Sequence, residues 1–171
     1  MAGRFVAEHH WLAHHELAFV LAKTQRTDGA ILHYQASLRL KPANADAANN
    51  LGNALLAKDR IAEAIAAYQQ AIRARPAYAE AHANLGNALA RAGRRAEAIA
   101  ACEHALQLDP ACLPAHVTLG DLFSQDGRQL EASRHYAAAL QLSKASDGTD
   151  SVAHMMRPGT RSCSERYRRH W

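Results

Sequence analysis

Asn50-Leu51-Gly52-Asn53-Ala54-Leu55 returns 34 residues later as Asn84-Leu85-Gly86-Asn87-Ala88-Leu89. A second matched stretch follows each block, at residues 62–68 and 96–102, and the two units close on Pro76 and Pro110. A period of this length indicates a tandem repeat whose units each form one supersecondary element and pack against their neighbours. The repeat therefore decides the fold before any single residue is considered.

Each unit reads as two helices. The first carries Leu51, Gly52 and Leu55 at the three-and-four spacing of one helical face, and the second carries Ala64 and Tyr68 in the same way. Glycine inside a helix costs about 1 kcal/mol relative to alanine, so its return predicts a close approach by a partner helix with small side chains. The repeated glycines are Gly52, Gly86 and Gly120, and the expected partners are Ala64, Ala98 and Ala132. Proline then ends the second helix, because it lacks the N–H and clashes with the preceding turn.

This pattern resembles the tetratricopeptide repeat family, in which Leu-Gly, a large residue, an alanine, an aromatic residue and a proline follow at fixed spacing. The unit at 45–78 matches at Leu51, Gly52, Leu55, Ala64, Tyr68, Ala71 and Pro76. The next unit matches at Leu85, Gly86, Leu89, Ala98, Ala105 and Pro110, with Cys102 in the aromatic position. One period later the matches are Leu119, Gly120, Phe123, Ala132 and Tyr136, with Lys144 in place of proline. One period earlier they are Leu17, Leu21, Ala30, Tyr34 and Pro42, with Ala18 in place of glycine.

The resemblance implies an all-α fold, a right-handed superhelical solenoid of antiparallel helix pairs with about four repeats. The expected segments are an N-terminal extension of the first helix (1–10), a divergent first repeat (11–44), two well-formed repeats (45–78 and 79–112), a last repeat without its proline (113–144) and a disordered basic tail (145–171). Inside the divergent repeat, Thr27-Asp28-Gly29 predicts the turn and residues 31–40 the second helix.

The charge of the chain is local. The formal net charge is +4, but residues 157–171 hold five arginines against Glu165, and the rest of the chain is balanced. No apolar run approaches the roughly 20 residues that a transmembrane helix needs. Three cysteines form no disulfide framework and suit a reducing compartment. We therefore expect a cytoplasmic protein that does not enter a membrane.

The first helices carry a repeated polar face opposite the Leu-Gly face. In the family this face lines a concave groove, so the resemblance implies a peptide-binding groove here. Its predicted residues are Asn49, Asn50, Asn53, Asn84, Asn87, Arg91 and Asp121. A side-chain amide donates and accepts hydrogen bonds, which suits it to the backbone of an extended peptide. The alternative is that these amides bridge neighbouring helices.

The predicted groove carries few cations. Family members that clamp the carboxylate ends of heat-shock chaperones use several lysines and arginines at these places, where this chain has mainly amides. Neutral or mildly basic extended segments are therefore the expected ligands. Alanine at Asn53 and Asn87 is expected to weaken a partner without lowering the melting temperature.

Two groups of residues have metal-ligand spacing. His10 and His14 are four apart, with His15 and Glu16 beside them, but no second cluster completes a site. The second group is Cys102, His104, Cys112 and His116. The repeat phase places Cys102 in a core position, so these four are not expected to converge. We expect neither a metal nor another cofactor.

No motif for catalysis is present: the sequence has no phosphate-binding glycine loop and no nucleophile elbow. The tail at 166–171 combines arginines with Tyr167 and Trp171, a composition that can bind single-stranded nucleic acid. A solubility role is the simpler interpretation, so nucleic-acid binding is not expected.

The predicted function is a non-catalytic scaffold that binds a protein or peptide partner. One alternative is a detached substrate-recognition arm, since residues 50–110 also look like the superhelical arm of O-linked N-acetylglucosaminyltransferases. The other is self-association into a homo-oligomer, for example a symmetric dimer through one uncapped end. The residues expected to be uncovered are Leu130, Tyr136, Leu140 and Leu142 at one end and Phe5 and Trp11 at the other.

Overall fold

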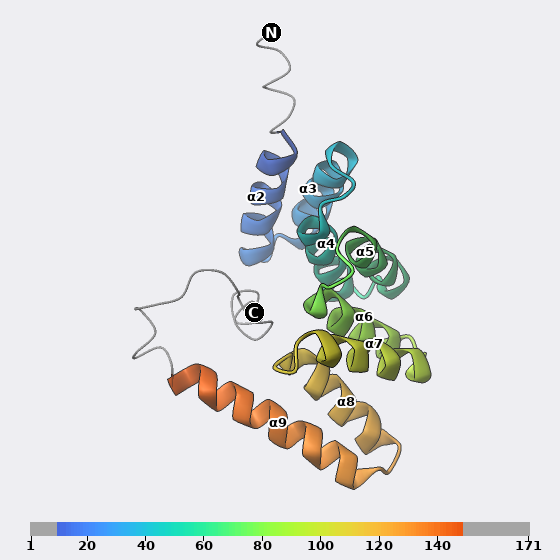
Figure 1. The fold of residues 1–171 in the computed structure, drawn as a ribbon. Helices are drawn as coiled ribbons and strands as arrows, with labels where there is room; N and C mark the ends of the chain where they lie inside the picture. Colours follow the sequence, from blue (N-terminus) through green and yellow to red (C-terminus); the bar gives the residue numbers. More distant parts are fainter. Residues whose placement is uncertain (1–9, 149–171) are drawn as a thin grey trace. The chain divides into compact units, whose positions relative to one another are not determined.

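Residues 10–148 are described by a computed structural model, in which they form eight α-helices joined by short turns (Figure 1). No strand occurs within these residues. The helices are α2 (His10–Lys23), α3 (Thr27–Leu40), α4 (Ala45–Ala57), α5 (Ile61–Ala74), α6 (Ala79–Arg91), α7 (Arg95–Leu108), α8 (Leu113–Gln125) and α9 (Gln129–Gly148). They alternate as first and second helices of successive repeats, which confirms the predicted all-α repeat fold.

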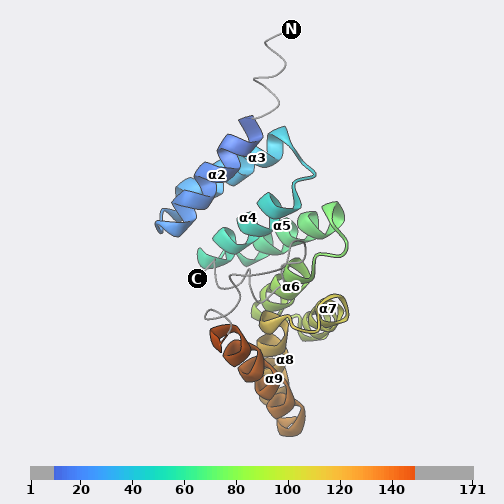
Figure 2. The ribbon, with the colours of Figure 1, turned by 60° about the vertical axis from the view of Figure 1, so that its left-hand side comes forward.

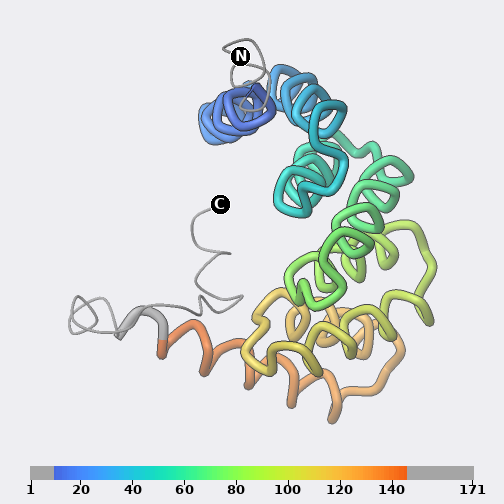
Figure 3. The backbone as a smooth tube through the Cα atoms, turned by 45° about the horizontal axis from the view of Figure 1, so that its top comes forward, coloured from blue at the N-terminus to red at the C-terminus, as the bar shows by residue number. Residues whose placement is uncertain are grey.

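The described residues divide into two compact units, one up to Ala81 and one from His82 onward. In the first unit α2 packs against α3, α3 against α4 and α4 against α5, and Figure 2 shows α2 and α3 lying along each other. In the second unit α7 packs against α8 and α8 against α9, and Figure 3 traces the tight turn between the last two. Packing between successive helices is typical of repeat proteins.

The repeated glycines lie under the side chain one turn past the expected alanines. A Cβ added to Gly120 would stand 2.6 Å from Cε1 of Tyr136, and one added to Gly86 would stand 2.3 Å from Sγ of Cys102. Gly52 lies in the same way under the ring of Tyr68. The expectation that alanine makes the closest contact is wrong in all three repeats, because the side chain of the tyrosine or of Cys102 takes the space that glycine leaves. Ala64, Ala98 and Ala132 are nevertheless buried.

One left-handed residue forms the turn inside each repeat. Gln25, Asp59, Gly93 and Gly127 have φ between +58° and +75° and are spaced 34 residues apart. The backbone N–H after each of them donates to a carbonyl five residues earlier, at 2.8–3.0 Å. This is the hydrogen bond that closes a helix on a left-handed residue. The turn therefore depends on the backbone conformation more than on one residue type.

Proline controls where the second helix ends. Helices α3, α5 and α7 each have 14 residues and stop two residues before Pro42, Pro76 and Pro110. Lys144 takes the place of proline in the last repeat, and α9 continues to Gly148 for 20 residues. Residues 145–148, the start of the predicted disordered tail, are therefore helical. The remainder of that tail and residues 1–9 lie outside the described residues.

The turn of the first repeat lies three residues before its predicted place. It is formed by residues 24–26, and α3 already begins at Thr27. Asp28 belongs to the first turn of α3, where a carboxylate interacts favourably with the helix dipole. The prediction at Thr27-Asp28-Gly29 was wrong because it followed glycine, whereas Gln25 supplies the left-handed residue.

Candidate functional site

The polar face of the first unit runs along α4. This helix starts after Asn44, whose Oδ1 accepts from the backbone N–H of Ala47 at 3.1 Å. Asp46, Asn50 and Asn53 follow at spacings of four and three, so they share one side of the helix. Asp46 accepts two hydrogen bonds from the Arg75 guanidinium, at 3.1 and 2.8 Å. This bidentate ion pair fixes the Asp46 side chain. Asp46, Asn50 and Asn53 together form the polar row of α4.

Asn49 does not belong to this row. It is fully buried, and its Nδ2 donates to Oε1 of the buried Glu80 at 3.1 Å. A buried amide that lost this carboxylate would be costly to leave unpaired. The contact joins the first helices of two successive repeats, as the bridging interpretation of the amides describes.

The other two asparagines of α4, Asn50 and Asn53, contact tyrosines of the second helices instead. The Tyr68 hydroxyl donates to Oδ1 of Asn53 at 2.7 Å. Burial raises the pKa of Tyr34, and a hydrogen bond with the Asn50 side chain partly opposes the shift. Both asparagines are half-buried, so the part of each amide that the tyrosine does not use can face a ligand.

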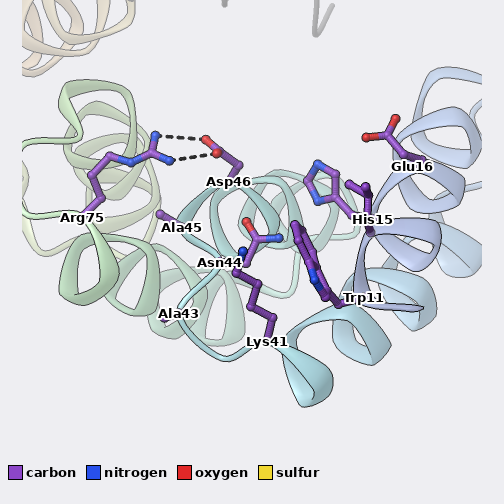
Figure 4. Close-up of a pocket in the computed structure, with 10 residues that line it drawn as sticks. Trp11, His15, Glu16, Lys41, Ala43, Asn44, Ala45, Asp46 and Arg75 are labelled. Atoms are coloured by element: carbon purple, nitrogen blue, oxygen red, sulfur yellow. Dashed lines mark hydrogen bonds and ion pairs between the residues drawn. The ribbon is translucent and has the colours of Figure 1, made fainter. Parts of the chain in front are cut away.

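A pocket of about 310 Å³ opens at the start of this row (Figure 4). It is lined by Trp11, Leu12, His15, Glu16, Lys41, Ala43, Asn44, Ala45, Asp46 and Arg75. Figure 4 shows Trp11 and His15 of α2 on one side, and Asn44 and Asp46 on the other. The ammonium of Lys41 lies over the Trp11 ring, 3.8 Å from its centroid. The sequence does not predict this pocket. It predicts only that Trp11 is uncovered at one end of the repeat.

His15 lines the pocket and has spare hydrogen-bonding capacity. Burial lowers its pKa, an effect that Glu16 and Asp46 oppose, so the ring favours its neutral form. Its Nδ1 is buried and has no hydrogen-bond partner within residues 10–148. The ring edge meets Tyr34, with 5.7 Å between the two centroids. A ligand in the pocket could satisfy this nitrogen.

The predicted groove residues of the second unit are less enclosed. Asp121 is exposed and accepts from the Tyr136 hydroxyl at 2.7 Å, as Asn53 does from Tyr68. Asn87 stands at the equivalent position and is exposed, but the residue 15 further on is Cys102, which has no hydroxyl to offer. Asn84 is half-buried and Arg91 exposed.

The histidines pair across helices instead of clustering along them. Nδ1 of His14 lies 2.8 Å from Nδ1 of His33, and Nδ1 of His116 lies 3.0 Å from Nδ1 of His135. The rings of His82 and His104 are in contact at a tilt of 38°, with centroids 4.3 Å apart. Among the described residues no three His, Cys, Asp or Glu side chains are arranged to hold a metal ion.

The two described cysteines are core residues. Cys102 and Cys112 are fully buried in one cluster with Ala105, Ala115 and Leu119. Burial, followed by the neighbouring Cys112, raises the pKa of the Cys102 thiol to about 12. Cys102 therefore acts as a small hydrophobic residue. Between residues 10 and 148, no helix has the length and apolar character needed to cross a membrane.

Comparison with protein families finds tetratricopeptide repeats over more than half of the chain. One family model, described as TPR repeat, matches residues 19–59 and 52–93, and a second, described as Tetratricopeptide repeat, matches residues 79–112. No curated protein matches the chain in a sequence search. The models identify the repeat type and give no specific support to the glycosyltransferase arm.

Solved structures with a similar fold include several of MamA. A crystal structure of MamA is 25% identical, covers 81% of each chain and superposes with a TM-score of 0.72. MamA from Desulfovibrio magneticus RS-1 is 24% identical over 78% of this chain and 76% of the other, with a TM-score of 0.69. The Arabidopsis OM64 TPR domain is 24% identical over 70% of this chain and 98% of the other, with a TM-score of 0.67. At these identities the similarity concerns the fold.

Proposed function

Because the chain belongs to the tetratricopeptide repeat family, we propose that it is a non-catalytic, cytoplasmic scaffold that binds an extended segment of a partner protein along α2 and α4. The observation that carries this proposal is the pocket at Trp11, which opens onto the polar row of α4. A pocket of about 310 Å³ has room for one anchoring side chain. The row beyond it offers hydrogen bonds to a peptide backbone.

The pocket favours a basic anchor. Lys41 already places its ammonium over Trp11, so the ring face accepts a cation. Such a contact contributes about 0.5–2 kcal/mol, depending on how far it is desolvated. Glu16 and Asp46 line the same pocket and would attract the incoming charge. A lysine or arginine of the partner would displace Lys41 from the ring, and its N–H groups would reach these carboxylates.

The peptide backbone would follow Asn50 and Asn53. One amide oxygen lone pair of Asn53 is used by Tyr68, which leaves the Nδ2 protons to donate to backbone carbonyls. In the second unit, the proposed binding surface is a separate one. Its residues are Asn84, Asn87, Arg91 and Asp121. Asn49 would not contact the peptide, because its side chain is hydrogen-bonded to Glu80. Its role would be to hold α4 in place.

The proposal is tested by selection from a random library of displayed 12-residue peptides on the immobilised full chain. Enriched sequences are then measured as fluorescein-labelled peptides by anisotropy. We expect an enrichment of lysine and arginine at one position, and about tenfold weaker binding to Trp11→Ala, the equivalent of about 1.4 kcal/mol. Asn50→Ala should weaken the same peptides by a smaller factor.

Gln69→Ala provides the matched control, since Gln69 is exposed on α5 away from both the pocket and the polar row. It should bind as the unmodified chain does. Selection that yields no enriched sequence, or peptides that bind Trp11→Ala and the unmodified chain equally, would contradict binding at this pocket.

A further inference from the structure

Apolar side chains are exposed on the first and last described helices. Leu17 and Val20 project from α2, and Tyr136 and Leu140 from α9. Contiguous exposed apolar surface commonly marks an interaction site. The repeat makes it possible to ask what covers the same positions elsewhere in the chain, because equivalent residues are 34 residues apart.

On α9 the exposed positions are those that the next repeat covers elsewhere. Tyr136 is 40% exposed, whereas the equivalent Tyr34 of α3 is 1% exposed. Leu140 is 53% exposed, and the equivalent Leu38 is 7% exposed. Helix α4 packs on α3, and Asn50 of α4 is hydrogen-bonded to Tyr34. The exposed face of α9 is therefore the face on which a second helix receives the first helix of the following repeat.

On α2 the exposed positions are those that the preceding repeat covers elsewhere. Leu17 is 45% exposed and the equivalent Leu119 of α8 is 1% exposed. Val20 is 54% exposed and the equivalent Leu122 is 2% exposed. Helix α8 is covered by α7, which contacts it directly. The exposed face of α2 is the matching half of the same type of contact.

The contact between α7 and α8 shows how the two halves fit. Cys102 and Ala105 of α7 share one buried cluster with Ala115 and Leu119 of α8, and Leu106 packs against it. The residues at these positions are Tyr136, Ala139 and Leu140 on α9 and Ala13 and Leu17 on α2. They are all apolar, so a joint between α9 and α2 would repeat an interface that the chain already forms.

We propose that a second copy of this chain occupies the exposed face of α9, with its α2 inserted as the first helix of a following repeat. This joint is head to tail. It differs from a symmetric dimer through one end, which would place two α9 faces, or two α2 faces, against each other. In the described residues a second helix packs on the first helix that follows it, as in α3 with α4 and α7 with α8. A head-to-tail joint leaves one free face of each kind, so assembly proceeds to longer chains or to a closed ring.

The proposal is independent of peptide binding and is tested by sedimentation velocity of the full chain over a range of concentrations. We expect the mean mass to rise with concentration beyond that of a dimer. Leu17→Glu and Leu140→Glu should each be monomeric, because one half of the joint is then charged. An equimolar mixture of the two variants should form a heterodimer that does not grow, since each retains the half that the other has lost.

Leu32→Glu is the matched control. Leu32 is largely exposed on α3, and the equivalent residues Ala66, Ala100 and Arg134 are also exposed, so a neighbouring repeat does not cover this position. This variant should assemble as the unmodified chain does, and circular dichroism should show unchanged helix content in all three variants. A monomeric full chain at every concentration, a single variant that still dimerises, or a mixture that stays monomeric would each overturn the proposal.

Discussion

The Tyr68 ring lies directly against the backbone of Gly52, where an added Cβ would stand 2.4 Å from Cε1 of the ring. Tyr68 is fully buried, so its ring has no free space into which it could move. The leucine-glycine pair that marks each repeat is thus one half of a contact whose other half lies 16 residues later.

This contact predicts that Gly52→Ala destabilises the protein. Alanine would gain about 1 kcal/mol in helix propensity, but overpacking a core costs about 1–3 kcal/mol or more, and a 2.4 Å approach to a rigid ring lies beyond ordinary contact. Urea unfolding should show a net loss of stability of up to about 2 kcal/mol by these values. Gly29→Ala is the control, since its Cβ would meet only the flexible end of Leu21 at 3.2 Å. It should leave stability unchanged or raise it slightly, and equal effects at the two glycines would contradict the packing explanation.

The asparagines at equivalent positions predict unequal effects. Asn53→Ala removes the acceptor of the Tyr68 hydroxyl and should lower stability by about 1 kcal/mol. Asn87→Ala should cost less, because Cys102 stands in place of the tyrosine. This revises the expectation from sequence that neither substitution changes the melting temperature. Thermal unfolding of both variants, with Tyr68→Phe as a third, would decide the matter. The view would fail if Asn87→Ala were the more damaging change.

The left-handed turn residues give a third prediction. Gln25 has φ +59°, a conformation that costs an ordinary residue about 1 kcal/mol or more. Gln25→Gly should therefore raise stability by about 0.5–1 kcal/mol after the greater freedom of glycine in the unfolded chain is subtracted. The reverse change, Gly93→Ala, should lower it by about 1 kcal/mol, and an added Cβ there meets nothing within 4 Å, so the effect would be one of backbone conformation. Denaturant midpoints that move in the same direction for both variants would refute this account.

The repeat explains why some features could be predicted and others could not. A residue that returns every 34 positions predicts a contact that also returns, and the fold and the position of each proline followed from that rule. The left-handed turn could have been found in the same way, because residues 25, 59, 93 and 127 are in phase. The pocket could not. Trp11 stands where other repeats have Ala45 or Leu113, so its contact with Lys41 occurs once, and a repeated pattern contains no information about it.

Two partly buried histidines, His15 and His135, predict how stability depends on pH. Burial, and then the neighbouring His116, lowers the pKa of His135, while Glu103 opposes the shift. Burial also lowers the pKa of His15. In the unfolded chain both histidines take up a proton near pH 6.5, which the folded protein resists, so the unfolded state binds more protons below that pH. Stability should be constant above about pH 7 and fall as the pH is lowered from about 6.5 toward 5.

Melting temperatures measured between pH 7.5 and 5 would show this fall in stability. His116→Gln should make it shallower, since it removes the second cause of the His135 shift, and His15→Gln combined with His135→Gln should reduce it further. Carboxylates paired with arginine, such as Glu63 with Arg60, have a lowered pKa and act at a lower pH, below about 4.5. A melting temperature that rises between pH 7 and 5 would contradict the assignment to these histidines.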